Sequence, residues 1–269
     1  MTEAAHHSRT AEVIAKVPAI TLGFWLIKIL ATTLGETGGD TVTMTWLGET
    51  TEEATGFGYL IGTAIFGVLL VLLVWLQIRA RTFNAWLYWA TIVASTTAGT
   101  TLADLATRSL GIGYPGGSIL LLLCVLGSLF AWYRAVGSVD VNTVAGPREE
   151  TFYWITITFS QTLGTTVGDW IADGDLGYSG SALVFGAALL VLAVLYAVTK
   201  VSRVFLFWAA FILTRPLGAT VGDFLDKPRE AGGLELSRPI ASLVLLAIIL
   251  GLVLALPQRP GHHPATATN

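Results

Sequence analysis

Charged residues are scarce in this sequence. They make up 12% of its 269 residues, whereas an ordinary soluble domain has about 25%. Hydrophobic residues make up 54%, and the mean hydropathy is +0.69. A helix that crosses a bilayer needs about 20 mostly apolar residues, and residues 118–133, 181–198 and 240–256 approach or meet this length. The composition excludes a soluble fold and predicts a chain that crosses the membrane repeatedly.

Groups that would indicate other functions are also missing. Cys124 is the single cysteine, which excludes an intramolecular disulfide and a cysteine-cluster metal site. We expect no enzyme activity, because the sequence has no HExxH motif, no phosphate-binding glycine loop and no nucleophile with a matching base. A net charge of −3 without a basic stretch argues against a nucleic-acid partner. Residues 1–15 lack the apolar core of a secretory signal peptide, so the first helix is expected to be retained.

One spacing pattern follows four tryptophans, Trp25, Trp89, Trp154 and Trp208. A glycine comes ten residues later in each copy: Gly35, Gly99, Gly164 and Gly218. A threonine comes twelve residues later, as Thr37, Thr101, Thr166 and Thr220, and an aspartate fifteen residues later, as Asp40, Asp104, Asp169 and Asp223. Self-similarity at a regular interval along the chain is typical of repeat architectures. The sequence therefore contains four copies of one structural unit.

Each motif helix is followed by a loop and a plainer apolar helix. The eight expected spans lie near residues 18–41, 57–78, 83–107, 116–134, 150–171, 180–199, 203–225 and 238–256. They form four two-helix repeats, about 18–78, 83–134, 150–199 and 203–256, in one membrane domain between an N-terminal tail (1–17) and a flexible C-terminal tail (257–269). This pattern predicts an all-α polytopic membrane protein with about eight transmembrane helices.

Basic residues near the helix ends predict the orientation, because cytoplasmic loops carry an excess of them. Nine lie on the side of both termini: Arg9, Lys16, Arg79, Arg81, Arg134, Arg148, Lys200, Arg203 and Arg259. Four lie on the other side: Arg108, Lys227, Arg229 and Arg238. Both termini are therefore expected in the cytoplasm. Because each repeat crosses twice, the four repeats are parallel rather than inverted.

The motif favours close contact between the motif helices. Pairs of small residues four apart let helix backbones approach in a membrane. The pairs are Gly35 with Gly39, Gly99 with Ala103, Gly164 with Gly168, and Gly218 with Gly222. The threonine and aspartate of each copy are three residues apart and so lie on neighbouring parts of one helix face. We expect the four aspartates and four threonines to converge toward the outer part of the bilayer.

Four carboxylates inside a membrane favour an ion-binding role, because buried ionisable groups usually face a partner, a cavity or an ion. Oxygen ligands suit manganese, magnesium or calcium. Glu36, present in the first copy alone, adds a fifth carboxylate one turn before Asp40. The predicted ligands are these five carboxylates and the four motif threonines, with the cation as substrate and no resident cofactor. Alternatively, the aspartates could cap loops, bond across helix interfaces or lie among the headgroups.

Lys28 and Arg215 are basic residues within the predicted spans. Lys28 lies about two turns before Glu36, and Arg215 lies the same distance before Asp223. We therefore expect charge pairing within the bundle. The two residues could be counter-charges displaced by a cation or proton, or members of permanent structural ion pairs.

With its four Trp-x9-Gly-x-Thr-x2-Asp copies, the chain resembles a bacterial family of uncharacterised membrane-anchored proteins defined by a repeat of unknown function. The resemblance covers residues 18–256. It implies repeated helix pairs in the bacterial cytoplasmic (inner) membrane and supplies no activity. A looser likeness connects residues 36–41, ETGGDT, to divalent-cation exchangers with repeated Glu-x-Gly-Asp motifs. This segment has one residue too many, and the other three copies have no glutamate.

The fourfold threonine and aspartate pattern favours a secondary transporter that exports or exchanges a small divalent cation such as manganese. Its expected partners are the lipid bilayer and a small cation or proton. One alternative is a non-transporting scaffold or partner subunit in which the motif serves packing alone. Another is a transporter of an organic solute or anion that uses Lys28 and Arg215. The sequence leaves a homo-oligomer open.

Overall fold

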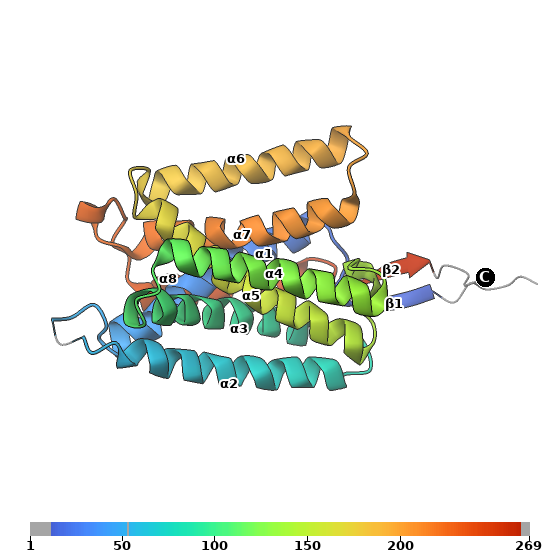
Figure 1. Ribbon diagram of the computed structural model, residues 1–269, viewed down its shortest axis with the longest axis horizontal. Helices are drawn as coiled ribbons and strands as arrows, with labels where there is room; N and C mark the ends of the chain where they lie inside the picture. Colours follow the sequence, from blue (N-terminus) through green and yellow to red (C-terminus); the bar gives the residue numbers. More distant parts are fainter. Residues whose placement is uncertain (1–11, 53, 265–269) are drawn as a thin grey trace, which may run out of the picture.

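The computed structural model describes residues 12–52 and 54–264, and nearly all of its elements are helices (Figure 1). The long helices are α1 (Leu22–Asp40), α2 (Phe57–Arg79), α3 (Ala85–Asp104), α4 (Tyr114–Val136), α5 (Pro147–Ala172), α6 (Gly177–Val198), α7 (Arg203–Asp226) and α8 (Arg238–Ala255). The short elements are β1 (Glu12–Pro18), η1 (Thr41–Trp46), η2 (Leu105–Ser109), η3 (Val141–Thr143), η4 (Arg229–Ala231) and β2 (Pro260–Pro264). The predicted polytopic all-α fold is confirmed.

Local sequence signals account for several helix starts. Thr21 caps α1 by accepting a hydrogen bond from the Phe24 N–H at 3.2 Å, and Asn84 caps α3 by accepting from the Leu87 N–H at 3.0 Å. Threonine and asparagine are common at this position because their oxygens satisfy an otherwise free backbone donor. Helices α4, α5 and α8 have a proline in the first turn, where its missing N–H removes no helical bond.

The four motif helices form an inner ring. Helix α1 packs against α3 and α7, and α5 packs against the same two helices, so the ring closes in the order α1, α3, α5, α7. The other helices cover it, and each packs on the motif helix that follows in the cyclic order: α2 on α3, α4 on α5, α6 on α7 and α8 on α1. The molecule is therefore a pseudo-fourfold bundle of four helix pairs.

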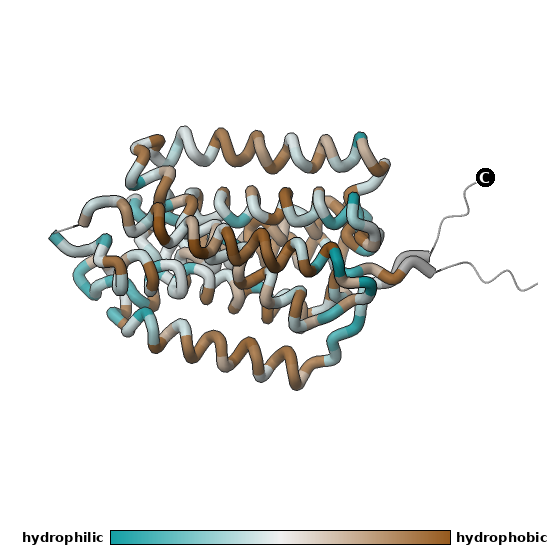
Figure 2. The backbone as a smooth tube through the Cα atoms, turned by 90° about the horizontal axis from the view of Figure 1, so that it is seen from below, coloured by the Kyte–Doolittle hydropathy of each residue, from teal (hydrophilic) through white to brown (hydrophobic). Residues whose placement is uncertain are grey.

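The outer helices supply most of the apolar surface, with hydrophobic runs along their length (Figure 2). Five described helices, α2, α4, α6, α7 and α8, are long and apolar enough to cross a membrane. Helices α1, α3 and α5 contain more polar residues, which the ring encloses. Leu183 on α6 and Leu254 on α8 are about three-quarters exposed, at 75% and 74%, so this surface suits contact with lipid.

Glycine contacts hold neighbouring helices of the ring together. The first glycine of each motif packs against the next repeat: Gly35 against Thr96, Gly99 against Gln161, Gly164 against Arg215, and Gly218 against Thr32. The second small residue does the same in three repeats: Gly39 meets Thr100, Gly168 meets Ala219, and Gly222 meets Glu36. A Cβ atom at Gly99 would lie 2.8 Å from the Cβ of Gln161, closer than side chains tolerate. The small residues thus permit the short distances between the helices.

The two described ends of the chain meet at one end of the ring, as an antiparallel pair of β1 and β2. Lys16 on β1 forms an ion pair of 2.5 Å with Glu150 of α5 and donates to the Ile78 carbonyl of α2 at 3.3 Å. The sequence predicted only tails at 1–17 and 257–269. The structure instead has strands β1 and β2 within these segments. Ala15 and Val17 of β1 are buried, at 0% and 2% exposure, which stabilises the strand pair. Residues 1–11 and 265–269 lie outside the described residues.

We call this end of the molecule the ribbon end. The opposite end, where α1, α3, α5 and α7 finish, is called the aspartate end, because the four motif aspartates lie near it.

Candidate functional site

The motif spacing extends in steps of four residues along each motif helix, and these positions form one face that we call the axial face. From the ribbon end, its five layers are Phe24, Tyr88, Tyr153 and Phe207; Lys28, Ile92, Ile157 and Phe211; Thr32, Thr96, Gln161 and Arg215; Glu36, Thr100, Thr165 and Ala219; and Asp40, Asp104, Asp169 and Asp223. Each of these residues is at most 8% exposed. Residues four apart are neighbours on a helix surface, so the layers follow one another along the ring.

Contacts between diagonally opposite helices show that this face points to the ring axis. Lys28 of α1 lies 3.5 Å from the Gln161 Oε1 of α5, and Arg215 of α7 donates to the Thr100 hydroxyl of α3 at 2.6 Å. Neither pair of helices is adjacent in the ring. The side chains therefore meet in the centre.

Aromatic side chains close the axis at the ribbon end. The hydroxyl groups of Tyr88 and Tyr153 are 2.6 Å apart, and the ring centroids of Phe24 and Phe207 are 6.3 Å apart. The tyrosine pair satisfies two phenol groups that would be costly to bury alone. The polar layers lie between this aromatic layer and the aspartate end.

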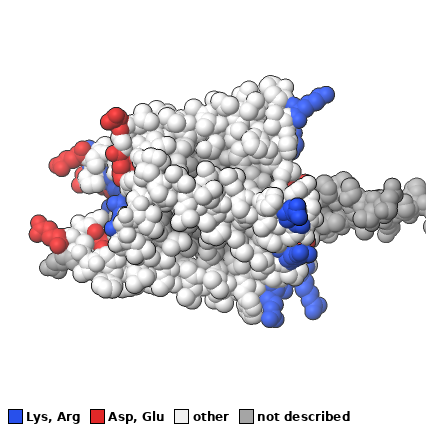
Figure 3. All heavy atoms as spheres, in the orientation of Figure 1, with Lys and Arg blue, Asp and Glu red and all other residues white. Residues whose placement is uncertain are grey.

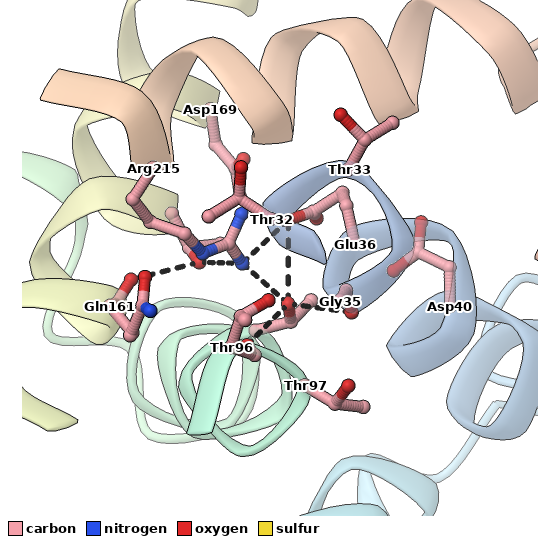
Figure 4. Close-up of polar contacts among 12 residues, drawn as sticks. Thr32, Thr33, Gly35, Glu36, Asp40, Thr96, Thr97, Gln161, Asp169 and Arg215 are labelled. Atoms are coloured by element: carbon pink, nitrogen blue, oxygen red, sulfur yellow. Dashed lines mark hydrogen bonds and ion pairs between the residues drawn. The ribbon is translucent and has the colours of Figure 1, made fainter. Parts of the chain in front are cut away.

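Arg215 occupies the middle of the axis (Figure 4). Its Nη2 lies 2.9 Å from Glu36 Oε2, 2.6 Å from the Thr100 hydroxyl and 2.5 Å from the Thr165 hydroxyl. The guanidinium thus contacts the other three motif helices. The Arg215 side chain is 0% exposed and that of Glu36 is 3% exposed, so this is a deeply buried ion pair.

The structure changes the charge partners expected from the sequence. Arg215 pairs with Glu36 rather than with Asp223, and Lys28 has no carboxylate within 4 Å among the described residues. Lys28 instead approaches Gln161 and lies over the Phe211 ring, 4.1 Å from its centroid. Spacing along one helix could not reveal these partners, because they depend on the alignment of neighbouring helices.

We call the layer of the four motif aspartates, Asp40, Asp104, Asp169 and Asp223, the aspartate layer. Lys227, directly after α7, neutralises part of this layer. Its Nζ lies 2.7 Å from Asp40 Oδ2, 2.9 Å from Asp223 Oδ1 and 3.9 Å from Asp226 Oδ1. Burial lowers the pKa of Lys227, but the carboxylates of Asp223, Asp40 and Asp226 outweigh this effect and hold that pKa well above its usual range. Lys227 therefore carries its charge at neutral pH.

Arg108 pairs with the other two aspartates of the layer, Asp104 and Asp169. Its Nε lies 2.7 Å from Asp104 Oδ1, and its Nη2 lies 3.9 Å from Asp169 Oδ2. From the sequence, Arg108 and Lys227 are predicted only as basic residues beyond the helix ends, on the side opposite the termini. Both follow a motif aspartate by four residues, so one more step of the same spacing would have identified them.

Several carboxylate oxygens in the layer lack a donor. Asp40 Oδ1, Asp104 Oδ2 and Asp169 Oδ1 are buried and accept no hydrogen bond from the described residues. Glu36, Asp40 and Asp223 each offer an oxygen within 4.8 Å of the others. An unpaired buried oxygen is costly, so this layer has acceptor capacity beyond what its own donors fill.

The net charge of the layer is negative. Its carboxylates are the four motif aspartates and Asp226, whereas its cations are Lys227, Arg108 and Arg238, the last lying 3.4 Å from Asp226. Five negative charges against three positive ones leave two negative charges when all groups are ionised. One divalent cation or two protons would balance them.

The motif threonines do not pair with the motif aspartates. Their hydroxyl groups donate to carbonyls of their own helices: Thr37 to Leu34, Thr101 to Ala98, Thr166 to Thr162 and Thr220 to Pro216. The preceding position lies on the axial face instead, because it is four residues before the aspartate rather than three. Thr100 and Thr165 occupy this position, and Gln161 lies one further step of four before Thr165, so the threonine-to-aspartate step of three did not predict these residues.

The backbone also changes at this level in two repeats. The π-helical turns η1 and η2 begin directly after Asp40 and Asp104. Such turns are rare and occur frequently at functional sites. Lys227 and Arg108 therefore each join one aspartate that precedes a π-helical turn to one that lies within an α-helix.

A ring of polar helices with buried ion pairs on its axis, covered by apolar helices, defines a polytopic membrane protein with internal repeats. The chain belongs to the family of the Repeat of Unknown Function (DUF347), whose model matches residues 23–83, 87–138, 152–202 and 206–257. Each match covers one observed helix pair, and the predicted resemblance to a repeat family is confirmed. No curated protein and no solved structure matches the chain.

Proposed function

We propose that this protein is a secondary transporter that exports or exchanges a small divalent cation, manganese or a similar metal, across the bacterial cytoplasmic (inner) membrane. The aspartate layer carries the proposal, because carboxylates from all four repeats lie buried together and three of their oxygens accept no bond from described residues. Buried ionisable groups in membranes commonly mark ion pathways. A site of oxygen ligands favours manganese, magnesium or calcium over copper or zinc.

The net negative charge of the aspartate layer favours exchange of a divalent cation for protons. Its two excess negative charges match one divalent cation or two protons, so either can replace the other without a change in net charge. Lys227 lies between Asp40 and Asp223, where a metal ion would bind, and its side chain is 12% exposed. Because a lysine ammonium is compact and sits on a flexible stem, Lys227 can shift toward Asp226, 3.9 Å away, as a metal binds, so that its charge stays in the layer.

The distribution of charge supports termini in the cytoplasm. Lysine and arginine side chains gather at the ribbon end, and acidic side chains gather at the aspartate end (Figure 3). Cytoplasmic loops carry the basic excess, so the ribbon end faces the cytoplasm in this proposal. The aspartate layer then lies toward the outer side, where a cation is released during export.

A non-transporting scaffold is the second candidate function. The glycine contacts around the ring favour it, since they bring the motif helices close at every interface. In such a scaffold the buried ion pairs would only fix the packing. Neutral replacements of the aspartates would then change stability without abolishing any transport.

Transport in proteoliposomes tests the proposal. Asp104→Asn and Asp169→Asn should each abolish manganese flux, measured by an indicator inside the vesicles, because each removes a charge of the layer while keeping the side-chain shape. Asp175→Asn is the matched control, since Asp175 is exposed in the turn between α5 and α6, and it should retain wild-type flux. Unchanged flux in both folded layer variants would remove these aspartates from the mechanism. No flux through the wild-type protein would favour the scaffold.

A further inference from the structure

A second group of unmatched polar atoms lies on the axis, from the Nε and Nη1 atoms of Arg215 toward the ribbon end. It consists of Lys28 from α1, Gln161 from α5 and Arg215 from α7, and all three are 0% exposed. These atoms are donors, whereas the unmatched atoms of the aspartate layer are acceptors. The two groups therefore have opposite chemistry.

The donors have few acceptors. Gln161 Nε2, Arg215 Nε and Arg215 Nη1 are buried and bond to no described residue. Lys28 Nζ has a long contact of 3.5 Å with Gln161 Oε1 and faces the Phe211 ring. A fully buried ammonium without a carboxylate is costly, as is a buried N–H without an acceptor.

The hydroxyl groups of Thr32 and Thr96, in the same layer as Gln161 and Arg215, accept none of these unmatched N–H groups. The Thr32 hydroxyl donates to the Ile29 carbonyl at 2.7 Å, and the Thr96 hydroxyl donates to the Ala31 carbonyl at 3.3 Å. Among the described residues, Glu36 is the single carboxylate paired with this group, and it binds Arg215 Nη2. Two positive charges against one negative charge leave one positive charge when all three groups are ionised.

We infer that Lys28, Gln161 and Arg215 bind one small monovalent anion, of which chloride is the simplest probe. A single negative charge balances the excess, and a halide accepts hydrogen bonds from any direction, as donors from three different helices require. The bound anion is separate from the cation of the aspartate layer, because Arg215 and its partners lie between them. This inference does not depend on the proposed transport.

Thermal unfolding in two salts tests the inference on the full-length protein in detergent. At equal ionic strength, saturating chloride should raise the wild-type midpoint by about 5 °C over gluconate, because a ligand that binds the folded state stabilises it. Lys28→Met should lose this difference. Lys200→Met is the matched control, since Lys200 is exposed in the connection between α6 and α7, and it should keep the difference.

A second variant distinguishes a bound anion from an uncharged lysine. Gln161→Glu places a carboxylate beside Lys28, so it should match the wild-type chloride midpoint even in gluconate and show no response to chloride. If Lys28 is uncharged, the new carboxylate is buried without a partner, and the midpoint falls in both salts. That result, or a wild-type protein that does not respond to chloride, overturns the inference.

Bromide diffraction gives an answer even where the variants do not fold. Wild-type crystals with saturating bromide should show an anomalous peak between Lys28, Gln161 and Arg215. The absence of a peak there overturns the inference.

Discussion

Glu36→Gln is expected to destabilise the folded protein by on the order of 3–5 kcal/mol, the usual cost of removing one partner from a buried ion pair. Arg215 remains charged and fully buried, and its only carboxylate partner within 4 Å among the described residues is Glu36, 2.9 Å away. Glutamine keeps the length and one hydrogen-bond acceptor, so the loss reports mainly the missing charge. Denaturant titration in detergent micelles measures the change.

Two further variants isolate this effect. Glu230→Gln changes an exposed glutamate of η4 and should leave the free energy of unfolding unchanged. Glu36→Leu combined with Arg215→Met removes both charges and should recover much of the lost stability, because apolar residues of similar volume can replace a buried ion pair. Equal stability of Glu36→Gln and the wild type would contradict the buried pair.

Gly218→Ala should weaken the ring by about 1–3 kcal/mol, the usual range for overpacking. A Cβ at Gly218 would lie 2.8 Å from the backbone carbonyl carbon of Thr32 and would also overlap the Thr32 side chain. Because a backbone atom is involved, α1 and α7 have to separate to accommodate even one methyl group. The unfolding midpoint in detergent measures the loss.

Gly186→Ala is the matched control. Gly186 lies in α6, and a Cβ there would meet nothing within 4 Å. Alanine should therefore stabilise this helix by about 0.5–1 kcal/mol through its lower backbone entropy cost. Equal effects of the two substitutions would show that α1 and α7 are not packed through Gly218.

The sequence was sufficient to predict the repeats and the helix pairs, because the features that define them are local. Tryptophan, glycine, threonine and aspartate recur at constant spacing, and apolar runs mark the helices. The glycine spacing also indicated close contact between the motif helices. The π-helical turns after Asp40 and Asp104 and the pairing of β1 with β2 carry no comparable local pattern.

The partners across the axis could not be predicted in this way. Pairing of Arg215 with Glu36 depends on how α7 is aligned with α1, and residues 179 positions apart carry no spacing signal. The roles of Arg108 and Lys227 were hidden for another reason, since both lie just beyond the aspartates, where a loop was expected. Steps of four residues, rather than the threonine-to-aspartate step of three, describe the axial face.

Equilibrium binding of manganese to the purified protein tests the central claim, that the aspartate layer binds one divalent cation. Electron paramagnetic resonance reports free manganese, so titration gives the number of bound ions per chain. We predict one ion for the wild type and for the exposed control Asp175→Asn, and none for Asp40→Asn, which removes a carboxylate held beside Asp223 and Glu36. A wild-type chain that binds no manganese, or a folded Asp40→Asn variant that binds as the wild type does, would contradict the claim.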